Sequence, residues 1–301
     1  MAKKKAELKY EKYFLKDVSR GARRKEWFED AIFIGPGHED IVPAVARMGI
    51  CIAAVQKPYM FHAPTHKHLF TEYFFFWGPN PYDMKEFDAE VHFTFGPEHE
   101  KHVIKKPTIV VAAPGVYHCP LNYAKANKPF YCMELFMTTG YTWVDLGDDK
   151  NEIIIPEQDF NRYFIDKGVV IPDERGGESM ALAAVPKDII PAGAGISASV
   201  TVVRNPYMLR EKCHKHNFTE YFYFFGSNPH DMKEFDAQVE FTFGEEKEKH
   251  VIKEPTIVVV PPGIYHAPVN FKKVGKPFHC VQVFVTSEYG FTPQMTGEMP
   301  S

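Results

Sequence analysis

Apolar residues occur along the chain in short runs, rich in β-branched and aromatic types and separated by Gly, Pro and Asn. Examples are GICIAAV from residue 49, TEYFFFWG from residue 71 and FYCMELFMT from residue 130. Runs of this length that alternate or are continuously apolar predict the strands of a sandwich or barrel. Helical periodicity is confined to the first thirty residues and to a stretch near 39–49. The pattern predicts an all-β protein with a short N-terminal helical arm.

The second half of the chain repeats the first. Shifted by 148 positions, residues 57–122 align with residues 205–270 without a gap and share 45 of 66 residues. A repeat of this length is too long for a solenoid and indicates two domain-sized units. We therefore expect an N-terminal barrel with its helical arm at 1–150 and a C-terminal barrel at 151–301.

Charge and cysteine content narrow the possible partners. The 35 basic and 39 acidic residues leave no net field to hold a polyanion, so we expect no nucleic-acid partner. No apolar run is long enough to span a bilayer, and no signal-peptide pattern follows the basic start. The odd count of five cysteines favours reduced thiols in the cytoplasm. A small-molecule substrate is the expected partner, and a homo-oligomer is possible.

Each unit carries a set of residues suited to binding a metal ion. Two His residues two positions apart on a strand project to the same face, a Glu follows four positions later, and a further His follows a Pro-Gly turn. Three imidazoles and one carboxylate suit Mn²⁺ or Fe²⁺, with Zn²⁺, Ni²⁺ and Co²⁺ as alternatives. The predicted ligands, one set per barrel, are His66, His68, Glu72 and His118, and His214, His216, Glu220 and His266.

These motifs resemble those of the cupin superfamily. The first cupin motif is matched by the His-x-His, Glu and Gly of each unit, ending at Gly78 and Gly226. The second motif is matched in full by Pro261, Gly263, His266 and Asn270, whereas Ala113 replaces the early Pro in the first unit. The resemblance covers most of the chain and implies a bicupin of two double-stranded β-helix (jelly-roll) barrels, similar to oxalate-decarboxylase-like and quercetinase-like enzymes.

The residues around the ligands suggest further roles. We expect Phe74 and Phe76 to share the strand face of Glu72 and form an aromatic wall beside the ion. The repeated insert NPxDMKEFDA is expected to be a surface hairpin loop. His102 and His250, at matching positions, are expected to brace a strand rather than to bind metal. Position 134 is Glu whereas the matching position 282 is Gln, and alternation does not show which face they occupy.

The two units differ most just before the His pair, where FHAPT in the first stands against LREKC in the second. Arg210 shares strand parity with His214, so it is a catalytic candidate that holds a carboxylate or enolate oxygen. His62, at the equivalent place in the first unit, is a candidate proton shuttle. The cationic Arg210 favours the second site as the one that carries the chemistry.

The sequence predicts a divalent-metal-dependent lyase, hydrolase or isomerase. Its substrate is expected to be a small oxygenated molecule, such as a β-dicarbonyl, a polyphenol-derived ring or a hydroxy or keto acid, whose enolate-like charge the ion stabilises during decarboxylation, ring-opening hydrolysis or isomerisation. A dioxygenase of phenolic or diketone substrates is the first alternative. A non-catalytic cupin that binds a small ligand is the second. Because many reactions share one fold, the substrate itself does not follow from the motifs.

Overall fold

The structure, a computed structural model, describes residues 8–16, 31–34, 48–61, 63–137, 144–145, 159–173, 175–189, 196–210, 212–286 and 292–293. Most of the regular structure in these residues is strand. Its helical elements are the 3-10 helices η1 (Glu11–Tyr13), η3 (Phe160–Tyr163) and η4 (Leu182–Ala184). Within the same residues, no helix has the length and apolar content needed to cross a membrane. The predicted all-β class is confirmed.

The first barrel consists of two facing sheets of antiparallel strands. Its strands are β2 (Ala31–Ile34), β3 (Met48–Val55), β4 (Tyr59–Phe61), β5 (His66–Lys67), β6 (Glu72–Trp77), β7 (Ala89–Phe95), β8 (Glu100–Ile104), β9 (Thr108–Ala112), β10 (His118–Ala126), β11 (Phe130–Met137), β12 (Val144–Asp145) and β13 (Phe164–Ile165). One sheet has the order β13-β9-β6-β11-β3-β2, and the other has the order β12-β5-β10-β7-β8 with β4 beside β10. The predicted ligands lie on both sheets, His66 and His118 on one and Glu72 on the other, so they meet in the barrel interior.

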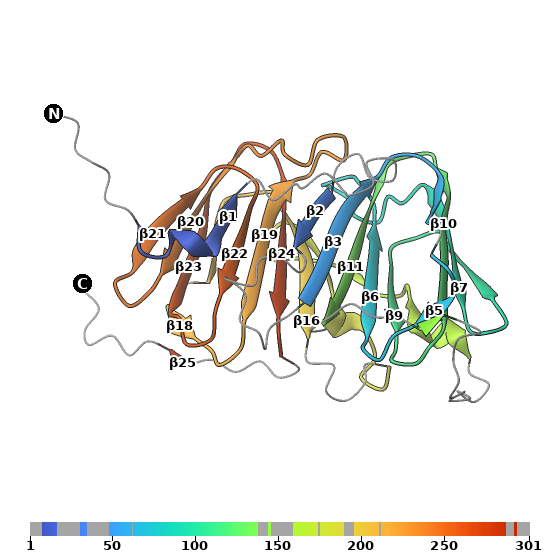
Figure 1. The fold of residues 1–301 in the computed structure, drawn as a ribbon. Coiled ribbons are helices and arrows are strands. Elements are labelled where there is room, and N and C mark those ends of the chain that lie inside the picture. Colours follow the sequence, from blue (N-terminus) through green and yellow to red (C-terminus); the bar gives the residue numbers. More distant parts are fainter. Residues whose placement is uncertain are drawn as a thin grey trace.

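The second barrel repeats this arrangement and lies beside the first (Figure 1). Its strands are β1 (Phe14–Lys16), β14 (Val170–Pro172), β15 (Glu178–Ala181), β16 (Ser197–Val203), β17 (Tyr207–Arg210), β18 (His214–Lys215), β19 (Glu220–Gly226), β20 (Ala237–Phe243), β21 (Glu248–Ile252), β22 (Thr256–Val260), β23 (His266–Val274), β24 (Phe278–Phe284) and β25 (Thr292–Pro293). The orders are β1-β22-β19-β24-β16-β15-β14 and β21-β20-β23-β18-β25, with β17 beside β23.

The two halves exchange short strands. β1, from the start of the chain, pairs with β22 of the second barrel, and β13, from the start of the second half, pairs with β9 of the first. Phe14 stacks on His250 with 3.9 Å between ring centroids, and Phe164 stacks on His102 at 4.2 Å. The two histidines therefore hold the exchanged strands. Of the predicted helical arm, the described part is η1 followed by β1, and the domain boundaries stay a prediction.

The barrels meet through the outer faces of two sheets, β13-β9-β6-β11-β3-β2 and β1-β22-β19-β24-β16-β15-β14. Apolar side chains of both sheets belong to one buried cluster. At its centre the Nε1–H of Trp77 donates to His279 Nε2 at 3.2 Å. Trp77 stacks on Tyr131 at 5.2 Å between ring centroids, and Phe225 stacks on His279 at 4.8 Å. Trp77 and Phe225 occupy equivalent positions of the two halves, and so do Tyr131 and His279. The contact is therefore a nearly symmetric aromatic cluster that contains one hydrogen bond.

The repeated inserts, residues 78–88 and 226–236, also join the two halves. The backbone N–H of Met84 donates to Glu178 Oε2 at 2.7 Å, and Arg204 Nε donates to the carbonyl oxygen of Pro81 at 2.6 Å. In the reciprocal direction, Gln56 Nε2 donates to the carbonyl oxygen of Pro229 at 3.0 Å. Met84 is fully buried. The expected surface hairpin is therefore, in part, a brace against the other barrel.

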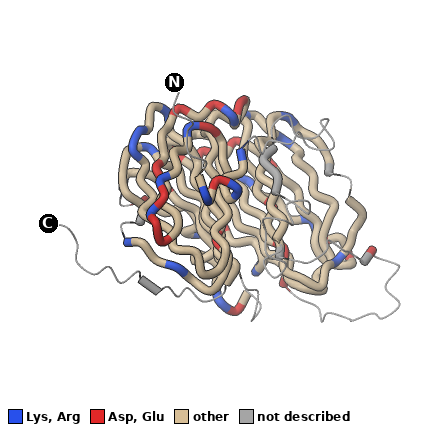
Figure 2. The backbone as a smooth tube through the Cα atoms, turned by 60° about the vertical axis from the view of Figure 1, so that its left-hand side comes forward, with Lys and Arg blue, Asp and Glu red and all other residues tan. Residues whose placement is uncertain are grey.

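Charged residues are interspersed by sign along the chain (Figure 2). Several ion pairs recur at equivalent positions, such as Lys125 with Glu90 at 3.0 Å and Lys272 with Glu240 at 2.7 Å. Exposed pairs of this kind contribute at most about 1 kcal/mol each. The stability of the fold therefore rests mainly on the buried apolar clusters of the barrels and their interface.

Candidate metal centres

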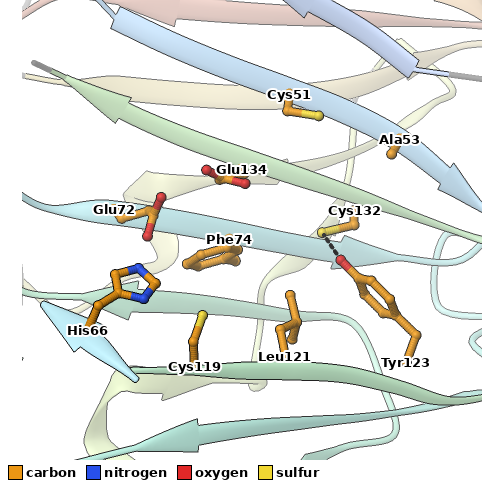
Figure 3. A pocket seen from close by; sticks show the side chains of 10 residues that line it. All are labelled: Cys51, Ala53, His66, Glu72, Phe74, Cys119, Leu121, Tyr123, Cys132 and Glu134. Atoms are coloured by element: carbon orange, nitrogen blue, oxygen red, sulfur yellow. Dashed lines mark hydrogen bonds between the residues drawn. The ribbon is translucent and has the colours of Figure 1, made fainter. Parts of the chain in front are cut away.

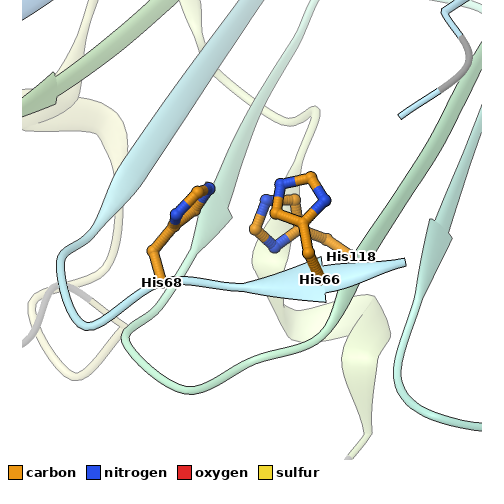
Figure 4. A group of neighbouring side chains, drawn as sticks. All are labelled: His66, His68 and His118. Atoms are coloured by element: carbon orange, nitrogen blue, oxygen red, sulfur yellow. The ribbon is translucent and has the colours of Figure 1, made fainter. Parts of the chain in front are cut away.

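The first His triad is assembled from one ligand strand and one turn. His66 lies in β5, directly opposite His118 at the start of β10, and His68 follows two positions after His66. The ligand nitrogens of the three rings lie within 4.8 Å of one another, and all three residues are buried. Figure 4 shows the rings converging from these two segments. His66 and His68 thus face the same side of the chain, as expected for residues two positions apart in extended backbone.

The third histidine is positioned by a turn and a bulge. Gly115, with a φ of +81°, donates its backbone N–H to the carbonyl oxygen of His68 at 2.7 Å. After His118 the register between β10 and β7 shifts, and Cys119 has a φ of +73°, a left-handed conformation that is uncommon outside glycine. Bulges of this kind re-aim side chains beside functional sites. The segment around Gly115 and Cys119 therefore bonds the turn to His68 and orients His118.

The second triad is built in the same way. His214 in β18 lies opposite His266 at the start of β23, and their ring centroids are 4.4 Å apart. Gly263, with a φ of +80°, donates to the carbonyl oxygen of His216 at 2.7 Å. Ala267 takes the bulge position with a φ of +78°. Both halves therefore keep the local backbone that brings three imidazoles together.

Hydrogen bonds fix which ring nitrogen faces the site. The Nδ1 atoms of His66, His118, His214 and His266 lie 2.6–3.1 Å from backbone carbonyl oxygens two residues earlier. A carbonyl only accepts, so Nδ1 carries the proton and, in the neutral ring, Nε2 keeps its lone pair. Burial also lowers the pKa of His118 and of His214 to about 4. Neutral imidazoles oriented through Nδ1 are the usual form of metal-binding histidines.

A glutamate lies beside each triad. Glu72 Oε2 is 3.1 Å from His118 Nε2 and 3.6 Å from His68 Nε2. Glu220 Oε2 is 3.0 Å from His266 Nε2 and 3.2 Å from His216 Nε2. Lone pairs of nitrogen and carboxylate oxygen at these distances repel unless a proton or a cation lies between them. The residues therefore fit a divalent ion held by three nitrogens and one oxygen, and their role as ligands stays a prediction.

The two sites differ in the neighbour of this glutamate. Desolvation raises the pKa of Glu72 to about 7, and the same effect, together with the charge of Glu72, raises the pKa of the adjacent Glu134 carboxyl well above its usual range. In the second site burial acts to raise the pKa of Glu220, but contacts with His216 and His266 lower it to about 2.

Gln282 takes the place of Glu134 in the second site. Its Nε2 donates a hydrogen bond to Glu220 Oε1. Position 134 therefore faces its barrel interior beside Glu72, and position 282 holds Glu220 in place. The sequence shows that position 134 is Glu and position 282 is Gln, but it does not show on which face of the strand these two side chains lie.

A cavity adjoins the first triad (Figure 3). It is lined at one end by His66 and Glu72 and at the other by Cys132 and Tyr123. Phe74, part of the predicted aromatic wall, lies between these ends, whereas Phe76 is fully buried in the core. Of the predicted catalytic residues, His62 lies outside the described residues. Arg210 ends β17 opposite Val269, and only its backbone is described.

Comparisons with known proteins place the fold. Neither protein-family models nor curated proteins match this sequence. Oxalate decarboxylase from Lactobacillus farciminis, solved as a formate complex, is similar in structure with a TM-score of 0.55 and 11% identity, over 88% of this chain and 83% of that one. A Bacillus subtilis oxalate decarboxylase studied for its Mn(II) centres has a TM-score of 0.52 and 11% identity, over 88% and 75%.

A plant protein shares the same architecture. The 11S allergen of Cocos nucifera has a TM-score of 0.53 and 10% identity, over 90% of this chain and 88% of that one. At these identities the likeness concerns the fold alone, and the similar proteins include both enzymes and an allergen. The paired barrels and their two histidine triads nevertheless agree with the cupin motifs in the sequence. The chain is therefore a bicupin in fold, with one histidine triad in each barrel.

Proposed function

We propose that this bicupin is a divalent-metal-dependent enzyme that acts on a small oxygenated organic substrate by lyase, hydrolase or isomerase chemistry. The observation that carries the proposal is the convergence of three imidazole nitrogens in each barrel with a glutamate oxygen beside two of them, next to a cavity in the first. The Mn(II) centres of a structurally similar oxalate decarboxylase support manganese as the ion, with iron as the alternative. The partner that we propose is a small molecule, and not nucleic acid or a membrane.

A bound divalent ion would polarise a substrate carbonyl or carboxylate oxygen and neutralise the negative charge that gathers there. His66, His68 and His118 would hold the ion in the first barrel through Nε2, with their orientation set largely by backbone carbonyl acceptors. Glu72 would supply the oxygen ligand. Phe74 and Leu121 give the cavity apolar surface, and fewer waters beside the reacting atoms would strengthen the charge interactions there.

Metal content tests the first half of this proposal. The protein loaded with Mn²⁺ and freed of excess ion should contain close to two ions per chain by elemental analysis. His66→Ala and the matched His214→Ala should each lower the content to about one, because each removes one nitrogen donor from a different barrel. A content unchanged by His66→Ala would show that the first triad is not a metal site.

Turnover tests the second half. Mn²⁺-loaded protein should be offered oxalate, acetylacetone and catechol with and without oxygen, with product formation and oxygen uptake measured together. Non-redox chemistry predicts turnover of at least one such substrate without oxygen, and its loss in a His66→Ala/His214→Ala double variant. Turnover that requires oxygen uptake would favour the dioxygenase alternative. Metal loading with ligand binding and no turnover of any substrate would favour a binding protein.

A further inference from the structure

The predicted ligands His66 and His118 converge from two strands that share little backbone pairing (Figure 4). β5 is two residues long, and among the described residues it pairs with β10 at one position, His66 opposite His118. Its other edge pairs with the two residues of β12. Metal ligands keep a fixed direction when further hydrogen bonds hold their rings and the backbone around them. A ligand strand this short therefore needs support from side chains.

Thr65, the residue before His66, provides such support. Thr65 is buried, with 8% of its surface exposed, and its hydroxyl donates to the carbonyl oxygen of Cys119 at 2.9 Å. Cys119 is the residue directly after His118. One buried hydroxyl therefore joins the neighbour of one predicted ligand to the neighbour of another.

The acceptor of this bond belongs to the residue that orients His118. Cys119 has a left-handed φ of +73°, and the register between β10 and β7 shifts after His118. A residue other than glycine keeps such a conformation only where its surroundings hold it. The Thr65 hydroxyl is part of those surroundings, because it bonds the carbonyl of this same residue. Loss of the hydroxyl would remove that donor and loosen the bulge.

A second contact fixes the direction of the hydroxyl. The Thr65 oxygen lies 3.2 Å from His99 Nδ1. The single hydroxyl hydrogen points to the Cys119 carbonyl, which can only accept, so the Nδ1–H of His99 donates to the Thr65 oxygen. Because the hydroxyl donates on one side and accepts on the other, it is held in the orientation that bonds the bulge.

The second barrel keeps the bulge without the hydroxyl. Cys213 stands at the position equivalent to Thr65, and Lys247 stands at the position of His99. Ala267 takes the bulge position with a φ of +78°. A thiol is a weak hydrogen-bond donor. The two centres therefore have the same set of predicted ligands but different support around it.

We propose that Thr65 is a positioning residue of the first metal centre, whose hydroxyl holds His66 and His118 at the spacing at which both bind one ion. The inference rests on the proposed metal function, because a ligand can be positioned only for an ion that binds. It also makes the two barrels unequal, since the affinity of one site out of two depends on a hydroxyl.

An isosteric substitution tests the hydroxyl alone. Thr65→Val keeps the branched shape and removes the hydroxyl, whereas Thr65→Ser keeps the hydroxyl. Both are made in protein that also carries His214→Ala, so that only the first triad is complete. In chelator competition Thr65→Val should weaken Mn²⁺ binding by about 10- to 100-fold, and Thr65→Ser by less than about threefold. An unchanged affinity in Thr65→Val, or equal losses in the two variants, would overturn the inference.

The EPR spectrum of bound Mn²⁺ separates positioning from a general effect on folding, because its zero-field splitting depends on the arrangement of the ligands. At saturating Mn²⁺, Thr65→Val should change the splitting, and Thr65→Ser should reproduce the spectrum of the parent protein. A hydroxyl that serves folding alone would lower the free energy of unfolding of metal-free Thr65→Val and leave the spectrum and the affinity unchanged. That result would overturn the inference.

Cys213→Val is the matched control, made in protein that carries His66→Ala so that only the second triad is complete. It introduces the same side chain at the equivalent position, where no hydroxyl is lost, and should change Mn²⁺ affinity by less than about threefold. A loss as large as that of Thr65→Val would mean that the valine side chain itself disturbs the neighbouring histidine, and would overturn the role of the hydroxyl.

Metal content separates this inference from the proposed function. Protein that holds two Mn²⁺ ions, with Thr65→Val binding as tightly as its parent, refutes only the role of Thr65. Protein that binds no Mn²⁺ refutes the metal-dependent function, together with the inference that rests on it.

Discussion

The hydrogen bond between Trp77 and His279 joins the two barrels and gives a sharp test of how they are held together. Both side chains are fully buried, and the indole N–H donates to His279 Nε2 at 3.2 Å. Trp77→Phe introduces the residue type that the other half carries at the equivalent position, Phe225. It keeps an aromatic ring at the interface and leaves the imidazole acceptor without its donor.

The expected cost follows from burial. An acceptor left unsatisfied in a buried site costs about 1–3 kcal/mol, and the smaller ring adds a cavity term of about 1–2 kcal/mol. Trp77→Phe should therefore lower the free energy of unfolding by about 2–5 kcal/mol. His279→Phe should cost about 1–3 kcal/mol, because it leaves the buried indole N–H without an acceptor. The double variant removes both partners, so no buried donor or acceptor is left unsatisfied and this part of the two single costs should largely disappear.

Urea unfolding of the four proteins in a double-mutant cycle measures this coupling. The two substitutions should couple by at least about 2 kcal/mol, with metal content unchanged in every variant because both residues lie outside the triads. Costs that simply add, within about 0.5 kcal/mol, would refute the view that this hydrogen bond contributes to the interface. Phe225→Leu is a useful control, since Phe225 stacks on His279 but has no polar group.

Three further predictions concern acidity, the second metal site and the thiols. Burial lowers the pKa of His279 to about 4, so this residue alone should account for a loss of about 2–3 kcal/mol of stability as the pH falls from 7 to 4.5, a loss that begins as the pH falls through about 6.5. In urea titrations of metal-free protein at both pH values, the His279→Phe variant should lose about 2–3 kcal/mol less stability than the wild type. Equal losses in the two proteins would contradict the lowered pKa of His279. Gln282→Leu removes the donor to Glu220 and should weaken Mn²⁺ binding by about 10- to 100-fold at one site of two in chelator competition; two unchanged affinities would count against it. The five cysteines are free, so intact mass without reductant should match five thiols, and a protein lighter by two protons would contradict this.

The parts of the fold that the sequence predicts are those encoded by local pattern. Short β-branched runs predict the strands, and the spacing of His66 and His68 predicts a shared strand face, which the structure contains. The duplication also indicates that whatever local structure forms once will form twice. Neither inference needs knowledge of distant contacts, which is why both could be made from one sequence.

Contacts between the halves could not be predicted, because a repeat shows equivalence but not which copy a segment packs against. The similarity of residues 12–17 to 162–167 gives no sign that Phe14 stacks on His250 rather than on His102. Position 134 posed a different difficulty. Both faces of β11 are apolar, one toward the barrel interior and one toward the interface, so alternation cannot assign Glu134. Only the register with Phe74 and Cys51 does so.

The exchanged strands also determine the order in which the sheets can be completed during synthesis. β13, which pairs with β9, is synthesised only after the rest of the first barrel, and β1 waits for β22, some 240 residues later in the chain. At about 5–20 residues per second, that second interval is roughly 10–50 s. During it the nascent chain has an unpaired N-terminal strand, a liability for pairing with other chains. Newly made protein therefore passes through a period in which complete sheets are unattainable, and it must remain free of aggregation until the second barrel emerges.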